Sequence, residues 1–338
     1  MSAIAAGCAA VVKPSEMTPQ SEKLLCELIP QYLDSRMVRV VKGAAAETTA
    51  LLKEKWDHIF YTGNGAVGRV VLRAAAEHLT PVTLELGGKS PLYFAEDGNI
   101  EVGARRILGT KMLNVGQTCI APDYLLVHNS VKDKLVSELK ANVKKFYGND
   151  VKQADSMARI VNERHFDRVV GLLNDAHGGK VVEGGLATAD RKDKFLPPTI
   201  VLDPSPTSRL MTEEIFGPVL PIIGVNSMAD ALKIINQKEH SLASYIYTTD
   251  SKKIEEFMCV FLFFLVCAPV CRTLTQAMLA SRRIRAARAS TTAFSTCAFS
   301  PLLKCACSLT RALQLQPGLA LWRQRPLGHG RVPRQGWL

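Results

Sequence analysis

The C-terminal section of this sequence contains no acidic residue. Between Cys259 and Leu338 there are eleven Lys or Arg residues and neither Asp nor Glu. Met1–Met258 carries 31 basic and 31 acidic residues, so the net charge of +11 arises entirely in the C-terminal section. The charge therefore does not indicate a nucleic-acid-binding face on Met1–Met258, and we expect no nucleic-acid partner.

Cysteine is scarce in Met1–Met258, where it occurs at Cys8, Cys26 and Cys119 alone. Three scattered cysteines exclude a disulfide scaffold and indicate a reducing compartment. We expect a cytoplasmic protein, with an organellar or ER-associated location as the alternative. The pair Cys305 and Cys307 has no second Cys/His pair at zinc-finger spacing, so no metal site is expected.

Long apolar runs are missing as well. The longest run, Phe257–Cys271, has fifteen residues, which is short of the roughly 20 that span a bilayer. The first residues lack the charged region and the long apolar stretch of a secretory signal. We therefore expect no membrane partner.

Strand and helix signals alternate along Met1–Met258, which predicts an α/β fold. The expected strands include Ala9–Val12, Val38–Val41, His58–Thr62, Val82–Leu86 and Leu92–Ala95. The expected helices include Ser21–Ile29, Glu47–Lys53, Ala66–Leu79, Ile100–Leu113 and Val131–Phe146. Pro30 should end the first of these helices. The alternation stops at Met258, and we expect Cys259–Leu338 to be disordered.

A Gly-rich turn, Thr62–Arg69, separates an expected strand from an expected helix and reads TGNGAVGR. Backbone N–H groups and the helix dipole at such a turn form an anion site that suits phosphate. A tight turn that merely joins a strand to a helix also needs glycine. The G-x-G-x-x-G spacing therefore leaves both interpretations open.

Two further segments each place a reactive side chain among small residues. Glu85 stands in the strand segment LELGG, where burial would raise its pKa toward the range of a general base. Cys119 stands in GQTCIAP, where small neighbours leave room for a substrate beside a thiolate nucleophile. A strand-end Glu paired with Lys, and a small core cysteine, are the corresponding alternatives.

A last motif, EEIFGP at Glu213–Pro218, is by itself typical of a helix end with solvated charges. In order and spacing, however, VTLELGGKSP, GQTCIAPDY and EEIFGPVLP together closely resemble the aldehyde dehydrogenase superfamily. The stretch HLTPVTLELGGKSP, with Cys119 placed 34 residues after Glu85, is similar to the class 3 branch, which includes fatty aldehyde dehydrogenases. Tyr32–Asn64 resembles the plant and algal members. The resemblance covers about Ser2 to Glu256.

The resemblance implies an aldehyde dehydrogenase-like α/β fold in three parts. A partial Rossmann-type NAD(P)-binding domain, 1–85, precedes an α/β catalytic domain, 86–258, and an aberrant basic tail, 259–338. The implied reaction oxidises a small-molecule aldehyde to a carboxylate with NAD or NADP. Cys119 forms a thiohemiacetal and then a thioester, and Glu85 activates the water that hydrolyses the thioester. The backbone N–H of Cys119 is one oxyanion donor.

The resemblance also assigns the cofactor contacts. Lys13 and Glu16 meet the adenosine ribose, Glu214 hydrogen-bonds the nicotinamide ribose, and Phe216 packs beside the nicotinamide ring. The Gly-rich turn faces the pyrophosphate. The full implied set is Lys13, Glu16, Gly63, Asn64, Gly65, Ala66, Val67, Gly68, Gly87, Glu214 and Phe216.

The sequence departs from the family's pattern at both ends. The family's first nucleotide-fold strand and its asparagine oxyanion donor have no counterpart here, so an exposed sheet edge is expected. The tail replaces the family's closing segment, and Leu321–Gly336 shifted forward by one base can read as a family-like Gly-rich motif. We infer a truncated or mis-spliced, catalytically impaired product with compromised dimerisation as one alternative. A basic tail that binds a membrane or nucleic acid is the second.

Overall fold

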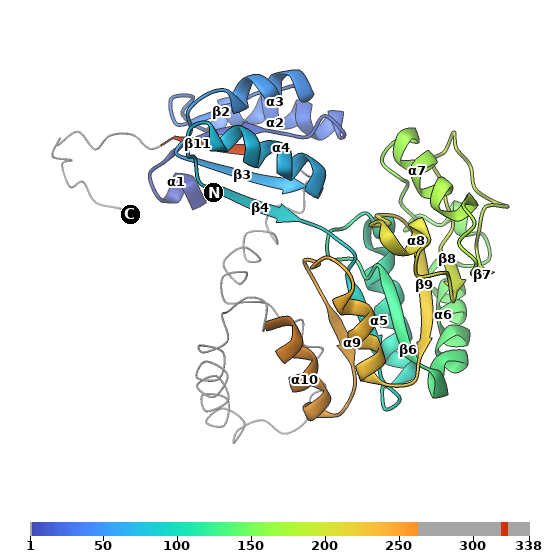
Figure 1. Ribbon diagram of the computed structural model, residues 1–338. Helices are drawn as coiled ribbons and strands as arrows, with labels where there is room; N and C mark the ends of the chain where they lie inside the picture. The colour runs from blue at the N-terminus through green and yellow to red at the C-terminus, as the bar shows by residue number, and fades with distance from the viewer. Residues whose placement is uncertain (1, 263–318, 324–338) are drawn as a thin grey trace, which may run out of the picture. The chain divides into compact units, whose positions relative to one another are not determined.

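The computed structural model describes residues 2–262 and 319–323, which belong to two compact units (Figure 1). Unit 1 comprises Met1–Leu86 and Pro301–Leu338, and unit 2 comprises Gly87–Ser300. The expectations for Cys305, Cys307 and most of the basic tail lie outside the described residues.

Unit 1 is built around a five-stranded sheet in the order β2-β1-β11-β3-β4. Its strands are β1 (Ala9–Lys13), β2 (Val38–Val40), β3 (His58–Gly63), β4 (Val82–Leu86) and β11 (Leu319–Arg323). Its helices are α1 (Ser2–Ala5), α2 (Pro19–Tyr32), α3 (Ala45–Leu52) and α4 (Gly65–Ala76). The pairs β1–β2 and β3–β4 are parallel. The order matches a doubly wound sheet, 3-2-1-4-5, with β11 in the position of the first strand.

The strand β11 corrects the expectation that the whole tail is disordered. It pairs antiparallel with β1 on one side and with β3 on the other. Without it, one edge of β1 and one edge of β3 would leave their backbone N–H and C=O groups unpaired. A short apolar segment of extended chain satisfies both edges at once, which also corrects the expectation of an exposed edge at this position. The strand runs opposite to its neighbours, which a first strand of the doubly wound fold would not do.

The helix α4 shows how local sequence sets an element of unit 1. Its N-cap is Asn64, whose side chain accepts a hydrogen bond from the backbone of Val67 at 2.9 Å. Gly68, Val71 and Ala75 are buried and share one face of the helix because they recur at intervals of three and four residues. That face packs on β3 and β4 with Ile59 and Leu84.

Unit 2 contains a six-stranded sheet in the order β10-β5-β6-β9-β8-β7, in which β7 alone pairs antiparallel. Its strands are β5 (Pro91–Phe94), β6 (Tyr124–His128), β7 (Lys180–Glu183), β8 (Thr199–Leu202), β9 (Val219–Val225) and β10 (Tyr245–Tyr247). Its α-helices are α5 (Ile100–Met112), α6 (Lys132–Tyr147), α7 (Glu163–Asn174), α8 (Arg209–Thr212), α9 (Met228–Asn236) and α10 (Ser251–Leu262). The short 3-10 helices are η1 (Leu113–Gly116), η2 (Asn129–Val131) and η3 (Val151–Gln153).

The sheet of unit 2 is buried on both faces, as parallel sheets are. On β5, Leu92 and Phe94 pack into a cluster with residues of α5 and α6. Their neighbour Tyr93 packs into a second cluster with residues of α9 and α10, because successive side chains of a strand point to opposite faces. Figure 1 accordingly shows α5 and α6 on the far side of this sheet from α9.

The part of the chain that the structure describes contains neither a membrane-spanning helix nor a metal-binding cluster of side chains. No helix within 2–262 is long and apolar enough to cross a membrane. Over the same described residues, no cluster of three or more His, Cys, Asp or Glu side chains is arranged to hold a metal ion. The expected break at Met258 falls inside α10, which continues to Leu262.

Candidate active site

Cys119 follows a strained turn of unit 2. Asn114, Val115 and Gly116 have φ angles of +50°, +59° and +74°, so three successive residues adopt the left-handed conformation. This conformation is a genuine outlier for the β-branched Val115, which is also buried. Strain of this kind persists where the surroundings over-determine the backbone, and it clusters at functional sites.

Hydrogen bonds fix the Cys119 loop on both sides. The Gln117 amide donates to the carbonyl oxygens of Asn114 and Arg159, both at 3.1 Å. The same amide accepts from the backbone of Val161 at 2.9 Å. Beyond the cysteine, the Tyr245 hydroxyl donates to the Ile120 carbonyl. Cys119 itself is half-buried, which is the exposure expected of a reactive thiol and not of a core cysteine.

Glu214 lies against the backbone of Gly87, at the start of unit 2. A Cβ atom placed on Gly87 would stand 2.2 Å from Glu214 Oε1, so a larger residue there would displace the Glu214 carboxylate. The Gly88 backbone donates a hydrogen bond to the Glu214 carboxylate. Burial raises the pKa of Glu214 to about 7, and the nearby Asp123 carboxylate adds to the rise. The carboxylate is therefore half-buried and held, unlike the solvated charge at a helix end that the motif alone favoured.

Phe216, which was expected beside a nicotinamide ring, continues the Glu214 segment in a left-handed conformation with φ +48°. The next residue touches the Cys119 loop, because a Cβ atom on Gly116 would stand 2.2 Å from the Gly217 carbonyl oxygen. The structure thus brings the Cys119 loop and the Glu213–Gly217 segment together within unit 2. The spacing of the motifs in the sequence does not reveal this contact.

Glu85 lies on β4 of unit 1, two residues before Gly87 in the sequence. Its side chain is half-buried, and burial raises the pKa of the carboxyl group. Among the described residues Glu85 forms no ion pair, so the alternative of a Glu–Lys pair at the strand end finds no support. A raised pKa is a property that a general base needs near neutral pH.

Lys13 joins the carboxyl ends of two strands in unit 1. It ends β1, is buried, and donates to the Gly43 carbonyl beyond β2 at 2.8 Å. It also pairs with the exposed Glu16 carboxylate at 3.1 Å. Ligands of doubly wound sheets bind at this edge of the sheet, near the point where the strand order reverses.

The Gly-rich turn stands at the same edge, after β3. A Cβ atom on Gly63 would lie 2.2 Å from the Tyr61 hydroxyl, so a larger residue would displace the Tyr61 side chain. Gly65 begins α4, and Ala66 and Val67 are exposed in its first turn. The N–H groups at a helix start have no intrahelical partner, so this turn can bind an anion.

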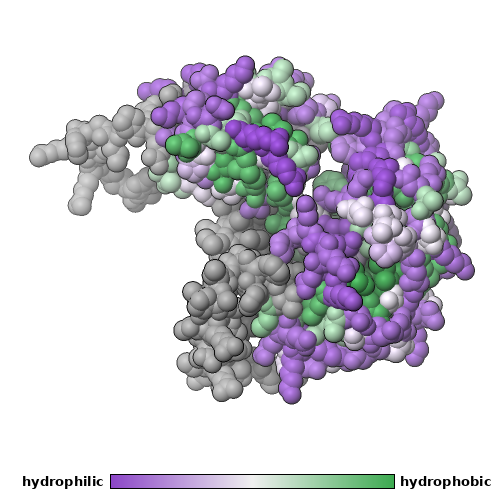
Figure 2. All heavy atoms as spheres, in the orientation of Figure 1, coloured by the Kyte–Doolittle hydropathy of each residue, from purple (hydrophilic) through white to green (hydrophobic). Residues whose placement is uncertain are grey.

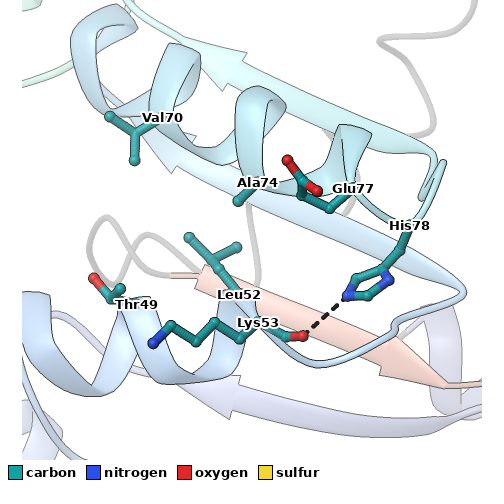
Figure 3. Close-up of a pocket in the computed structure, with 7 residues that line it drawn as sticks. All are labelled: Thr49, Leu52, Lys53, Val70, Ala74, Glu77 and His78. Atoms are coloured by element: carbon teal, nitrogen blue, oxygen red, sulfur yellow. Dashed lines mark hydrogen bonds between the residues drawn. The ribbon is translucent and has the colours of Figure 1, made fainter.

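A pocket of about 350 Å³ lies between α3 and α4 of unit 1 (Figure 3). The figure shows Leu52 and Thr49 of α3 facing Val70 and Ala74 of α4, and His78 Nε2 lies 2.9 Å from the Lys53 carbonyl oxygen at one end. Figure 2 shows apolar surface over α4, where the exposed side chains include Val67, Val70 and Leu72. The pocket is therefore a mainly apolar slot with charged residues at its rim.

Sequence reasoning missed a group of charged side chains that surrounds Glu214. Lys89 and Asp123 form a buried ion pair of 2.6 Å, although they are 34 positions apart in the sequence. Lys111 is 1% exposed and stands 3.9 Å from Asp123. The available signal was a charged residue in a largely apolar segment, such as Lys111 in the segment that also contains Ile107, Leu108 and Met112. Without the fold, nothing showed that they converge.

The two units, with a Gly-rich turn on one sheet and a strained cysteine loop beside a held carboxylate, define an α/β protein built like a dinucleotide-dependent dehydrogenase. The model of the aldehyde dehydrogenase family matches residues 1–261. This chain belongs to the aldehyde dehydrogenase family.

Curated relatives come from animals and plants. A dimeric NADP-preferring aldehyde dehydrogenase of Mus musculus is 50% identical over 256 residues, which is 76% of this chain and 55% of the mouse protein. Aldehyde dehydrogenase family 3 member A2 of Rattus norvegicus is 50% identical over 253 residues, 75% of this chain and 51% of the rat protein. An aldehyde dehydrogenase of Craterostigma plantagineum is 47% identical over 258 residues, 76% of this chain and 53% of the plant protein. The chain spans about half the length of these relatives.

Solved structures of aldehyde dehydrogenases have folds similar to that of this chain. The substrate-bound Staphylococcus aureus AldH has a TM-score of 0.73 and 40% identity, covering 76% of this chain and 55% of that chain. The γ-glutamyl-γ-aminobutyraldehyde dehydrogenase of Burkholderia cenocepacia has a TM-score of 0.70 and 31% identity, covering 76% of this chain and 54% of that chain. The fold expectation, an aldehyde dehydrogenase-like α/β protein, is confirmed.

Proposed function

We propose that this chain carries the chemistry of an NAD(P)-dependent aldehyde dehydrogenase, which converts an aldehyde and water to a carboxylate. The observation that carries the proposal is the strained, hydrogen-bonded loop that presents Cys119 next to the Glu213–Gly217 segment. Cys119 attacks the aldehyde carbonyl carbon as a thiolate and forms a C–S bond. Its backbone N–H donates to the resulting oxyanion. With a nicotinamide bound as hydride acceptor, loss of hydride from this thiohemiacetal would leave a thioester. Glu85 then takes a proton from the water that hydrolyses the thioester.

We infer that unit 1 holds the adenosine half of the cofactor and unit 2 carries the nucleophile. The apolar slot between α3 and α4 suits a flat adenine ring, and the Gly-rich turn supplies N–H groups for the pyrophosphate. Glu16, which pairs with Lys13, accepts hydrogen bonds from the adenosine ribose hydroxyls in this proposal. Glu214 accepts from the nicotinamide ribose hydroxyls. The nicotinamide group, when bound, supplies the hydride acceptor.

The direct test uses the purified chain with an aliphatic or aromatic aldehyde. Formation of NADH or NADPH and hydrolysis of an activated ester are measured in parallel. The ester assay needs Cys119 and an acyl pocket but no hydride acceptor, so it separates the cysteine chemistry from cofactor binding. Cofactor binding with neither activity would contradict the proposal and would identify a catalytically impaired product of an aldehyde dehydrogenase gene.

Replacing Glu85 by glutamine is expected to slow thioester hydrolysis while leaving thioester formation intact. A rapid burst of reduced cofactor should then precede a steady rate lowered by about 10²–10⁴, the usual contribution of a general base. Because burial raises the pKa of Glu85, the wild-type steady rate should rise as pH passes through that raised pKa. Stopped-flow absorbance measures both phases. A variant with no burst, or with a pH profile like that of the wild type, would contradict the role.

Replacing Glu16 by glutamine is expected to favour NADP⁺ over NAD⁺. The Glu16 carboxylate can accept from ribose hydroxyls but repels a 2′-phosphate, and removing its charge relieves that repulsion. The ratio of the NADP⁺ and NAD⁺ association constants should rise about tenfold, which calorimetry can measure. Glu27→Gln, which removes an exposed carboxylate on α2, is the matched control. Equal loss of both cofactors in Glu16→Gln would argue against a ribose contact.

A further inference from the structure

The Glu214 segment is held through its backbone by three charged side chains from different elements. Lys89, just before β5, donates to the Glu213 carbonyl at 2.9 Å. Arg168 of α7 donates to the Glu214 carbonyl at 3.1 Å and also to the Ile215 carbonyl. The third, Asp123, accepts from the Ile215 N–H at 3.1 Å. The backbone around Glu214 is thus clamped on its N–H and C=O groups alike.

Asp123 occupies the centre of this clamp. It is 3% exposed, stands four positions after Cys119, and its backbone N–H donates to Ser90 at 2.8 Å. Its carboxylate binds Lys89 through one oxygen and receives the Ile215 N–H principally through the other. One residue therefore connects the Cys119 loop, the segment after Gly88, and the segment that carries Glu214.

Lys111 is the member of this cluster without a hydrogen bond. Its Nζ is fully buried and has no hydrogen-bond partner among the described residues. The nearest ion-pair partner recorded for it is Asp123, at 3.9 Å. Burial lowers the pKa of Lys111 to about 8, and the charges of Asp123 and Glu214 oppose that effect. A buried cation without a hydrogen bond costs free energy, so its presence needs a reason beyond packing.

We propose that Asp123 and Lys111 are positioning residues for Glu214. Asp123 anchors the segment that holds Glu214 against Gly87, and Lys111 supplies the positive charge that offsets Asp123 next to the Glu214 carboxylate. The inference rests on the proposed function in one respect, that Glu214 binds the cofactor ribose. An ionised Glu214 accepts from ribose hydroxyls more strongly than a protonated one. The two positioning residues thereby set the pH range in which the cofactor binds.

The charged groups that face Glu214 predict opposite effects for the two residues. Asp123 raises the pKa of Glu214, whereas Arg168 of α7 and Lys89 lower it. Glu213 precedes it in the same segment but pairs with the exposed Arg209 at 2.7 Å. Removing the negative charge of Asp123 should therefore lower the pKa of Glu214. Removing the positive charge of Lys111 should raise it.

The test measures NAD⁺ binding by calorimetry between about pH 5.5 and 9 in the full chain. In the wild type the association constant should rise with pH through about 7, where Glu214 ionises. Lys111→Met should move the midpoint upward and Asp123→Asn should move it downward, each by about one unit. Lys111→Met should fold, because Met fills a similar volume and no hydrogen bond of Lys111 is lost. Lys140→Met, an exposed change on α6, should leave the midpoint unchanged.

Hydrogen exchange of the Glu213–Phe216 segment tests, without any cofactor, whether Asp123 holds the backbone of this segment in place. Asp123→Asn should increase exchange there about tenfold, because the Ile215 N–H then donates to a neutral amide. Unchanged exchange in Asp123→Asn, or shifts of the same sign in both variants, would overturn the proposal. If the wild type bound no cofactor while exchange rose as expected in Asp123→Asn, the anchoring role of Asp123 would be supported and the proposed function would be contradicted.

Discussion

Cys119→Ala is expected to abolish aldehyde oxidation and ester hydrolysis together. Both reactions begin with the same C–S bond, and the methyl group of alanine cannot form it. Loss of a nucleophile removes the covalent route entirely, so both rates should fall by at least about 10³. The reduced-cofactor absorbance and the ester chromophore report the two rates. Binding of NAD⁺ should survive, since the substitution removes only the sulfur atom and none of the side chains proposed to contact the cofactor.

The matched control for this prediction is Cys26→Ala. Cys26, on α2, is half-buried like Cys119, and burial raises the pKa of its thiol. Its thiolate is therefore scarce at neutral pH, and its removal should leave both activities unchanged. Iodoacetamide should alkylate Cys119 before Cys26. The rate at which activity is lost should equal the rate at which Cys119 is alkylated. Activity retained in Cys119→Ala, or lost in Cys26→Ala, would show that a different residue is the nucleophile.

The sequence predicted elements well where periodicity and glycine placement agree. Ala9–Val12 and His58–Thr62 were expected as strands and are found as β1 and β3, each one residue longer. Pro30 was expected to end a helix, but α2 continues to Tyr32. Proline removes one N–H, and a helix can tolerate that loss in its final turn, where the tertiary contacts of the earlier turns already hold it.

The candidate site was predictable as a set of motifs but not as an arrangement. Cys119 and Glu214 were selected because their flanking residues resemble a family, and the structure brings their loops together through Gly116 and Gly217. The left-handed Val115 could not be predicted, because a β-branched residue gives no local signal for that conformation. Nor could the Lys89–Asp123 pair, since sequence patterns carry no information about which distant charges meet inside a fold.

The tail contains an element that its sequence did not predict. Its composition gave no sign of a fold, yet Leu319–Arg323 lies at the centre of the sheet of unit 1. Strand pairing depends on backbone groups that every residue except proline possesses, so a segment needs little sequence specificity to fill an open position. The strand forms because the facing edges of β1 and β3 are otherwise unpaired, and not because of a pattern in the tail.

Leu321→Pro is therefore expected to disrupt unit 1 as a whole. Leu321 is the central residue of β11, paired with Val11 of β1 and Ile59 of β3. Proline has no N–H to donate and is excluded from the interior of a sheet, so the ladder on at least one side is lost. Hydrogen exchange in β1 and β3 should rise by at least about tenfold. NAD⁺ binding should be lost, because Lys13 and Gly63 end these two strands.

Leu321→Val is the control that isolates the backbone. Valine keeps the N–H and suits a strand, so exchange in β1 and β3 and binding of NAD⁺ should match the wild type. The helices and strands of unit 2 should keep their exchange rates in both variants, since β11 pairs only within unit 1. If Leu321→Pro left β1 and β3 protected, the two strands would have to satisfy their edges without β11. The central position would then be open to another strand, which a synthetic peptide of residues 319–323 could detect by binding.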